Sequence, residues 1–250
     1  MMKRLAAPAV AGFALLAAPA PALDLSAMSD DERTAFRAEI RAYLMDNPEV
    51  ILEAVNLLEA RQAEAQAQAD VALVEANRDA IFDDGFSWVG GNPDGDITLV
   101  EFLDYRCGYC RRAMPEVAKL LETDGNIRLI VKEFPILGEE SMTSSQFAVA
   151  VKQVAGPEAY KQAHDALMEM TGELTEVTLR RLSNGLGLDT DAILARMDSD
   201  DVMQEISQTR ALAQRLQISG TPTFVLEDEL LRGFLPADRM GELIAEKRGG

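Results

Sequence analysis

Cysteine and histidine are scarce in this sequence of 250 residues, and their scarcity excludes two kinds of stabilisation. There are two cysteines and one histidine, His164. A closed structural zinc site needs about four ligands, so these residues cannot complete one. Two cysteines also cannot staple a chain of this length in the manner of small disulfide-rich domains. The protein must therefore fold around an apolar core, which its 48% hydrophobic content allows. Its length is enough for one large or two small domains.

Basic residues are also few. The sequence has 24 Lys and Arg against 42 Asp and Glu, which gives a net charge of −18. A surface of this sign repels nucleic acid, so we exclude nucleic acid as a partner. The charge favours solubility and does not identify a substrate.

Long apolar runs are absent after the first residues of the sequence. Lys3 and Arg4 precede an apolar stretch over residues 5–18, and Ala20-Pro21-Ala22 fits the small-residue rule of a signal-peptidase site. The stretch is short for a membrane span and contains prolines, which disfavours an uncleaved anchor. There is no cysteine near the predicted cleavage site, which excludes a lipoprotein. We therefore expect residues 1–22 to be a signal peptide, cleaved near Ala22, and the mature protein to be exported to the periplasm.

The two cysteines that are present form the motif Cys107-Gly108-Tyr109-Cys110. An apolar run over residues 97–103 leads into the motif, and a predicted helix from Cys107 to about residue 121 leads out of it. A thiol at a helix N-terminus lies at the positive end of the helix dipole, which favours the thiolate. The first thiolate can attack a foreign disulfide, and the second can then resolve the mixed disulfide. This redox chemistry requires no metal and no other cofactor.

Nearby charges act on the cysteines in both directions. Arg106, Arg111 and Arg112 are expected to favour the thiolate, whereas Asp104 and Glu101 are expected to oppose it. A purely structural disulfide is the weaker interpretation, because so short a loop restricts the unfolded chain very little. A Cys-x-x-Cys pair where a strand meets a helix is typical of redox sites.

Residues 29 to about 84 are predicted to be helical. Ser29 and Glu32 fit a capping box, and Asn47-Pro48 fits the start of a second helix. Residues 61–70 are almost entirely Ala, Gln and Glu, which favours helix but offers little to bury. Two interpretations stay open: an exposed arm or subunit contact, and a helical linker packed on the main domain.

The rest of the sequence predicts an α/β domain that is interrupted by helices. The order of strand, cysteine helix and strand implies a parallel pair with a right-handed crossover. The predicted strands cover 86–89, 97–103, 127–134, 218–226 and 230–234. The predicted helices cover 107–121, 141–154, 157–170, 175–185, 189–197, 200–216 and 236–247.

The cysteine motif and the later Gly220-Thr221-Pro222-Thr223-Phe224 resemble the DsbA family of the thioredoxin superfamily, over about residues 86–247. The resemblance implies a thioredoxin-like α/β fold over residues 85–250, with an inserted helical domain at about 137–216. It also implies that Pro222 is a cis-proline facing the redox pair and that Thr221 offers its backbone to the substrate. Glu101, six residues before Cys107, matches the family's acidic residue beneath the second cysteine. Its alternative interpretation is an ordinary strand residue.

Residues 23–84 resemble the N-terminal helical extension of ScsC-type members, which implies an oligomerisation arm. The Cys-Gly-Tyr-Cys motif and the threonine before the proline also resemble DsbC-type isomerases. Classical DsbA has a histidine between its cysteines, and this sequence lacks it. The absence of that histidine argues against a strongly oxidising role.

The resulting hypothesis is a periplasmic thiol–disulfide oxidoreductase with isomerase or oxidase activity. Its expected partners are unfolded or misfolded exported proteins and a membrane redox partner that resets the cysteines, and it is a possible homo-oligomer. The alternatives are a chaperone-like binding module and a copper-handling thiol protein. His164 is expected to lie on a helix face or in the core, and the methionines of the helical block are expected to pack rather than to bind copper.

Overall fold

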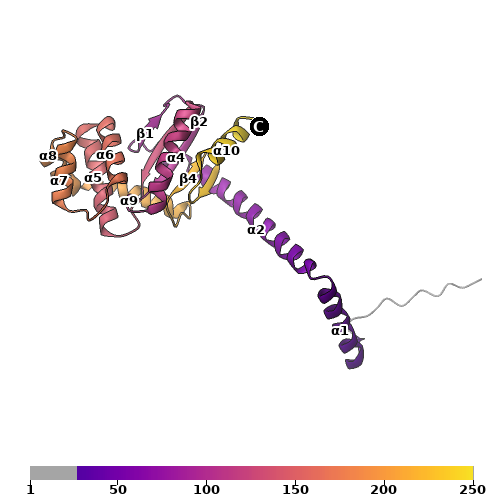
Figure 1. Ribbon diagram of the computed structural model, residues 1–250. Helices are drawn as coiled ribbons and strands as arrows, with labels where there is room; N and C mark the ends of the chain where they lie inside the picture. The colour runs from indigo at the N-terminus through magenta and orange to yellow at the C-terminus, as the bar shows by residue number, and fades with distance from the viewer. Residues whose placement is uncertain (1–26, 250) are drawn as a thin grey trace, which may run out of the picture. The chain divides into compact units, whose positions relative to one another are not determined.

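A computed structural model of the protein describes residues 27–249 (Figure 1). The predicted signal peptide, residues 1–22, lies outside the described residues. The chain divides into two compact units, one ending at Ala60 and the other running from Arg61 onward. No helix within the described residues is both long and apolar enough to cross a membrane.

The first unit consists of helix α1 (Asp30–Asp46) and the first part of helix α2 (Glu49–Ala76). The predicted capping box is confirmed, since the Glu32 amide donates to Ser29 Oγ and the Ser29 amide donates to Glu32 Oε2 at 2.8 Å. Helix α1 buries no side chain. The large apolar side chains that are exposed in this unit are Phe36, Ile40, Tyr43, Met45, Ile51, Leu52, Val55, Leu57 and Leu58.

The second unit is built on a five-stranded mixed sheet with the order β1-β3-β2-β4-β5. Its strands are β1 (Trp88–Gly91), β2 (Ile97–Leu103), β3 (Ile127–Glu133), β4 (Thr223–Leu226) and β5 (Glu229–Arg232). Strands β2 and β3 are parallel, and helix α4 (Gly108–Asp124) connects them, as the sequence predicts. The remaining neighbours are antiparallel.

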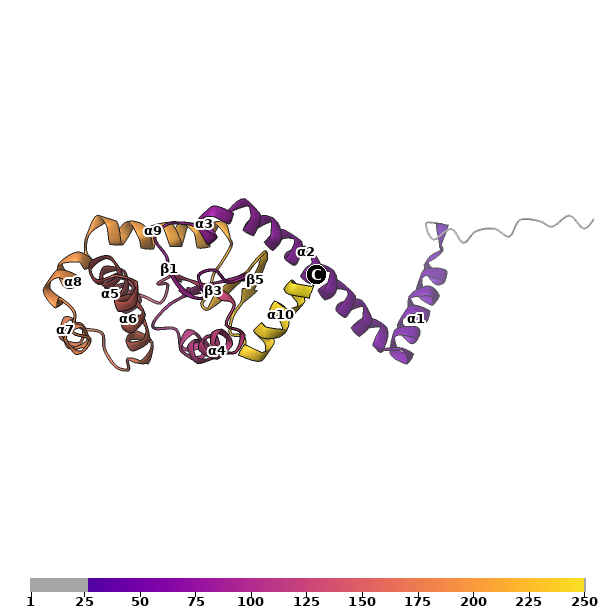
Figure 2. The ribbon, with the colours of Figure 1, turned by 90° about the horizontal axis from the view of Figure 1, so that it is seen from above.

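Helices cover both faces of this sheet (Figure 2). Helices α4 and α10 (Ala237–Gly249) pack together on one face. Helices α3 (Arg78–Phe82) and α9 (Asp200–Arg215) lie on the other face, against β2 and β3. Val74 at the end of α2 and Ile81 of α3 belong to the apolar cluster on that second face. The later part of α2 and helix α3 thus contribute to the core of the second unit, whereas residues 61–69 are exposed.

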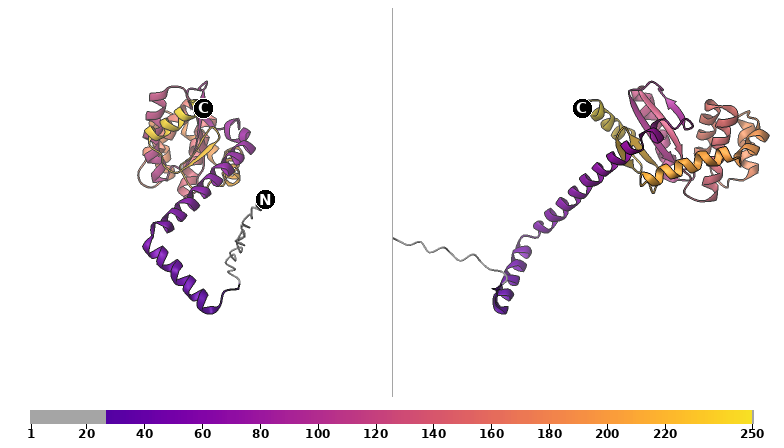
Figure 3. Two further views of the ribbon diagram at one scale, coloured as in Figure 1. Left: turned by 90° about the vertical axis from the view of Figure 1, so that its right-hand side faces the viewer. Right: turned by 180° about the vertical axis from the view of Figure 1, so that it is seen from behind.

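The helical insertion lies between β3 and β4. It contains α5 (Glu139–Ala155), α6 (Pro157–Glu169), α7 (Glu176–Gly185) and α8 (Thr190–Met197). Helix α9 then returns from the insertion to the sheet (Figure 3). These helices agree with the predicted ones to within a few residues, because each carries an apolar face that packs in the larger cluster.

The predicted strand over residues 218–226 is too long. Only Thr223–Leu226 pairs with β2, and the chain before it turns through Gly220 and the cis Thr221–Pro222 bond. Proline has no amide hydrogen to donate to a sheet, so the strand begins after it. The last strand is likewise shifted, to Glu229–Arg232, because Gly233 adopts a φ of 91° and ends it.

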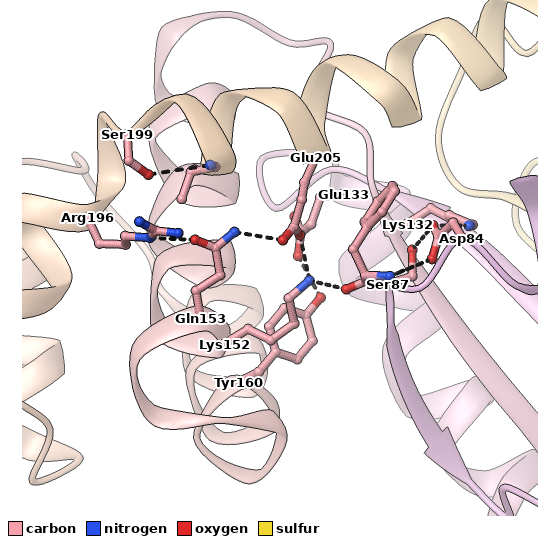
Figure 4. A network of polar contacts seen from close by, with 12 residues as sticks. Asp84, Ser87, Lys132, Glu133, Lys152, Gln153, Tyr160, Arg196, Ser199 and Glu205 are labelled. Carbon is pink, nitrogen blue, oxygen red and sulfur yellow. Dashed lines mark hydrogen bonds and ion pairs between the residues drawn. The ribbon is translucent and has the colours of Figure 1, made fainter.

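A buried ion pair fixes the segment between α3 and β1 to the sheet. Lys132 of β3 is 1% exposed, and its Nζ donates to Asp84 Oδ2 at 2.5 Å and to the Ala80 carbonyl at 2.9 Å (Figure 4). A charge this deeply buried requires such a partner.

Candidate active site

The cysteine pair lies where strand β2 gives way to helix α4. Cys107 is the N-cap residue of α4, and Cys110 lies in its first turn. Both are free thiols. Cys107 is 7% exposed and Cys110 is fully buried. An incoming disulfide can therefore reach Cys107 before Cys110.

Residues that are distant in the sequence complete the surroundings of Cys107. Cys107 Sγ donates to the Thr221 carbonyl oxygen at 3.1 Å. The bond between Thr221 and Pro222 is cis, which confirms that expectation. The fold thus brings Thr221 and Pro222 against the cysteine motif, as the resemblance to the DsbA family implies.

Cys110 has a different environment. Its sulfur accepts a hydrogen bond from the Asp104 amide at 3.5 Å. Burial raises the pKa of the Cys110 thiol well above its ordinary value, and the nearby Glu101 carboxylate and Cys107 raise it further. The two thiols of the motif are therefore unequal, since Cys110 stays protonated unless a base removes its proton.

Glu101 of β2 is the candidate for that base. It is 4% exposed, and burial raises the pKa of its carboxyl from 4.5 to about 8. Its Oε1 atom has no hydrogen-bond partner among the described side chains and backbone groups. It lines a cavity of about 250 Å³ whose other walls are mostly apolar side chains, together with Lys161, His164 and Asp165 of α6. A buried carboxyl without a partner can take up and release a proton near neutral pH.

The three arginines near the motif each make contacts of their own. Arg106 forms an ion pair with Glu140 at 2.9 Å and donates to the Gly172 carbonyl, both in the insertion. Arg111 Nε donates to the Tyr105 carbonyl at 3.0 Å. Arg112 stacks over the ring of Tyr109, 5.4 Å from its centroid. Arg106 is therefore not an unpaired charge beside Cys107, because Glu140 neutralises it.

The spacer residues of the motif have distinct environments. Tyr109 is one of the exposed large apolar side chains of the second unit. A β-carbon added at Gly108 would meet no neighbouring atom within 4 Å, so the space beside Gly108 is empty. Asp104 is buried and organises the turn, since its carboxylate accepts from the Arg106, Ile136 and Leu137 amides.

Sequence reasoning missed a buried polar cluster beside the motif. Tyr105, two residues before Cys107, donates to Glu133 Oε1 at 2.7 Å and contacts His164 Nδ1 at 3.1 Å. His164 is buried, as expected, but its contact with the active-site loop was not predicted. The only signal was a pair of charged residues, Lys132 and Glu133, in an otherwise apolar strand.

No group of three or more metal-ligating side chains lies close enough to hold a metal anywhere in residues 27–249. The site brings together two thiols, a buried carboxyl and a cis-proline segment. Together with the fold, these define a dithiol protein of the thioredoxin-like class.

The particular family follows from comparison with known proteins. The chain matches the DSBA-like thioredoxin domain over residues 98–245, more than half of its length, and it belongs to this family of thiol–disulfide oxidoreductases. Residues 32–65 match the copper resistance protein ScsC N-terminal domain.

Solved structures agree with the family. A thioredoxin-like oxidoreductase from Silicibacter pomeroyi DSS-3 is 42% identical, with a TM-score of 0.65, covering 70% of this chain and 99% of that one. Proteus mirabilis ScsC in a transitional conformation is 28% identical, with a TM-score of 0.63, covering 89% of this chain and 98% of that one.

Among curated proteins, Na⁺/H⁺ antiporter NhaA 3 of Salinispora tropica is 29% identical over 171 residues. The match covers 68% of this chain and 26% of the antiporter, so the chain spans about a quarter of that relative's length.

Proposed function

We propose that this protein exchanges disulfides with exported proteins in the periplasm through Cys107 and Cys110. The single observation that carries the proposal is the inequality of the two thiols, with Cys107 at the helix N-terminus against Thr221 and Cys110 buried behind it. Cys107 thiolate attacks a substrate disulfide, forms a mixed disulfide and releases one substrate thiolate. Cys110 then attacks the Cys107 sulfur, which releases the second substrate thiolate and leaves the Cys107–Cys110 disulfide. The reverse sequence oxidises a substrate dithiol.

Glu101 accepts the Cys110 proton during resolution. The buried Cys110 thiol must lose its proton before it can attack, and Glu101 is the carboxyl whose charge acts on it. When Glu101 is ionised it takes that proton, and when it is protonated it returns the proton in the reverse direction.

Thr221 and Pro222 form the substrate-binding segment. The Thr221 carbonyl lies 3.1 Å from the nucleophilic sulfur, so a substrate strand that pairs with this backbone places its own sulfur beside Cys107. Unfolded or misfolded exported proteins offer such extended segments, and a membrane redox partner resets the cysteine pair.

The direct test uses the mature protein and a scrambled-disulfide substrate. Cys107→Ser should abolish both refolding of that substrate and oxidation of a reduced one, because no mixed disulfide can form. Cys110→Ser should accumulate mixed disulfides, visible as mass-shifted species on non-reducing gels. Met203→Leu, remote from the motif, serves as the control and should behave as wild type. Full activity of Cys107→Ser would refute the proposal and favour a chaperone-like binding module.

A copper-handling role is the second candidate, favoured by the match to the copper resistance protein ScsC N-terminal domain. Two thiolates are suitable ligands for Cu(I). Titration of reduced against alkylated protein with Cu(I) separates the candidates, because only thiol-dependent binding supports the copper role.

A further inference from the structure

The buried polar cluster beside the motif joins three separate parts of the fold at one carboxylate. Glu133, the last residue of β3, accepts from Tyr105 and Tyr160 on Oε1, at 2.7 and 2.6 Å, and from Ser145 on Oε2, at 2.7 Å. Tyr105 belongs to the loop before Cys107, whereas Ser145 and Tyr160 belong to α5 and α6 of the insertion. Glu133 is thus a direct link between the insertion and the loop that carries the nucleophile.

The three donors favour the ionised form of Glu133. Each hydroxyl group has one proton to donate, and a carboxylate, which is acceptor-only and makes stronger hydrogen bonds than a neutral carboxyl, suits three donors best. Because Tyr105 gives its proton to Glu133, its 3.1 Å contact with His164 requires Nδ1–H of the imidazole to be the donor. Protonation of Glu133 would weaken these bonds, because a neutral carboxyl is a poorer acceptor than a carboxylate.

Tyr105 can transmit this state to Cys107 because the intervening turn is short and closed. The Cys107 amide donates to the Asp104 carbonyl at 3.0 Å, and Arg111 of α4 donates to the Tyr105 carbonyl. The Tyr105 ring is fully buried and packs edge-on against His164, and its hydroxyl adds the directional contact with Glu133. A loop held at Tyr105 therefore has little freedom at Cys107.

We propose that Glu133 is a positioning residue, whose carboxylate holds the Cys107 loop against the helical insertion through Tyr105 and so sets the reactivity of Cys107. The inference rests on the proposed function for its biological meaning, since it concerns the same nucleophile. It assigns to the insertion a part in preparing the redox site.

The surroundings of Glu133 place its ionisation in the physiological range. Burial raises the pKa of the Glu133 carboxyl to about 7, against the lowering effect of its three hydrogen bonds and of the Lys152 charge. Burial also lowers the pKa of His164 to about 4, so the imidazole is neutral. Figure 4 shows Glu133 beside Tyr160, Lys152 and Glu205. The titratable groups that face it are Tyr105 from the loop, Lys152 from α5, Tyr160 and His164 from α6, and Glu205 from α9.

The test is the alkylation of reduced, full-length mature protein by iodoacetamide between pH 5 and 9. Peptide mass spectrometry separates Cys107 from Cys110, and thiolate absorbance, recorded in parallel, gives the ionised fraction. In the wild type, the alkylation rate of Cys107 divided by the ionised fraction of the thiol should rise around pH 7. Glu133→Gln should remove this rise and slow Cys107 by about tenfold at pH 9, the change expected from losing a hydrogen bond to a charged group.

Two further variants separate positioning from general stability. Tyr105→Phe keeps the ring and loses only the hydroxyl, so it should match Glu133→Gln. Tyr160→Phe removes an equal bond from Glu133 but not from the loop. It should keep the wild-type rate at pH 9 and move the rise to higher pH, because that bond lowers the Glu133 pKa.

Wild-type profiles for both Glu133→Gln and Tyr105→Phe would overturn the inference, and so would equal slowing by Tyr160→Phe at pH 9. If Glu133→Gln fails to fold, the alkylation rates of Cys107 in Tyr105→Phe and Tyr160→Phe are sufficient to test the inference. Alkylation needs no disulfide substrate, so these outcomes are independent of whether Cys107→Ser retains activity.

Discussion

At the scale of single residues, the site is a set of groups whose ionisation depends on burial. Glu101 and Cys110 are both buried, and the Glu101 charge raises the free energy of ionising Cys110. Both have raised pKa values because water is excluded from them. This arrangement suits a thiol that reacts second, since it remains protonated until the mixed disulfide has formed.

The raised pKa of Glu101 predicts a pH-dependent effect on stability. Folded Glu101 keeps its proton up to about pH 8, whereas the unfolded chain releases it near 4.5. The contribution of Glu101 to the free energy of unfolding is therefore fully present below pH 4.5 and is lost as the pH rises toward 8. Glu101→Gln should increase the free energy of unfolding by roughly 3 kcal/mol at pH 7 and change it little at pH 4.

Urea unfolding of the reduced protein at both pH values measures this difference. Glu122→Gln, on the exposed side of α4, is the matched control and should keep the wild-type pH dependence. An equal effect of Glu101→Gln at pH 4 and pH 7 would contradict the assignment of a raised pKa.

At the scale of elements, ion pairs and hydrogen bonds with at least one buried partner join segments that are distant in the sequence. Lys132 ties the segment after α3 to the middle of the sheet through Asp84 and the Ala80 carbonyl. Arg232 of β5 pairs with Asp70 of α2 inside the second unit, with Nη2 2.9 Å from Oδ1. These links explain why residues 61–84 belong to the second unit and not only to the helical extension.

Loss of the Lys132 partner should be severe. Asp84→Asn leaves the Lys132 ammonium buried without a counter-charge, which should lower the free energy of unfolding by about 3–5 kcal/mol. Asp238→Asn breaks an ion pair with Lys119 whose side chains are 84% and 57% exposed. That control should stay close to the wild type, because water and salt screen exposed pairs. Chemical denaturation compares the two, and similar small changes in both would show that Lys132 finds another partner.

At the scale of the whole molecule, the exposed apolar side chains of α1 and early α2 favour self-association. Ile40, Tyr43 and Leu52 are each at least 45% exposed. Apolar side chains gathered on one segment mark an interaction surface. We propose that this segment makes the protein an oligomer and biases it toward isomerisation, since several thiolates then surround one substrate.

A protein that begins at residue 23, the expected product of signal-peptide cleavage, should therefore be an oligomer by light scattering. A chain beginning at Arg61 should be a monomer that keeps oxidase activity. Isomerase activity on a scrambled substrate should fall in the shorter chain. The shorter chain begins at Arg61 so that it keeps Val74 and Ile81, which belong to the core of the second unit. A monomeric mature protein, or an unchanged isomerase rate after truncation, would refute the role of the arm.

The sequence by itself determined the features that depend on local spacing. The capping box at Ser29, the cysteines at the start of α4 and the strand–helix–strand crossover each follow from residues that are close in the chain. The positions of Thr221, Pro222 and Glu101 followed from resemblance to the DsbA family, and the structure places them beside the cysteines.

Only the tertiary structure decided which distant polar groups meet. Glu133 and Lys132 are adjacent in β3, yet alternation along the strand sends one to Tyr105 and Tyr160 and the other to Asp84. Their partners come from several other parts of the chain, so no local pattern could reveal them. The physical reason is that apolar periodicity selects the buried face of an element, whereas the satisfaction of a buried charge depends on which elements that face meets.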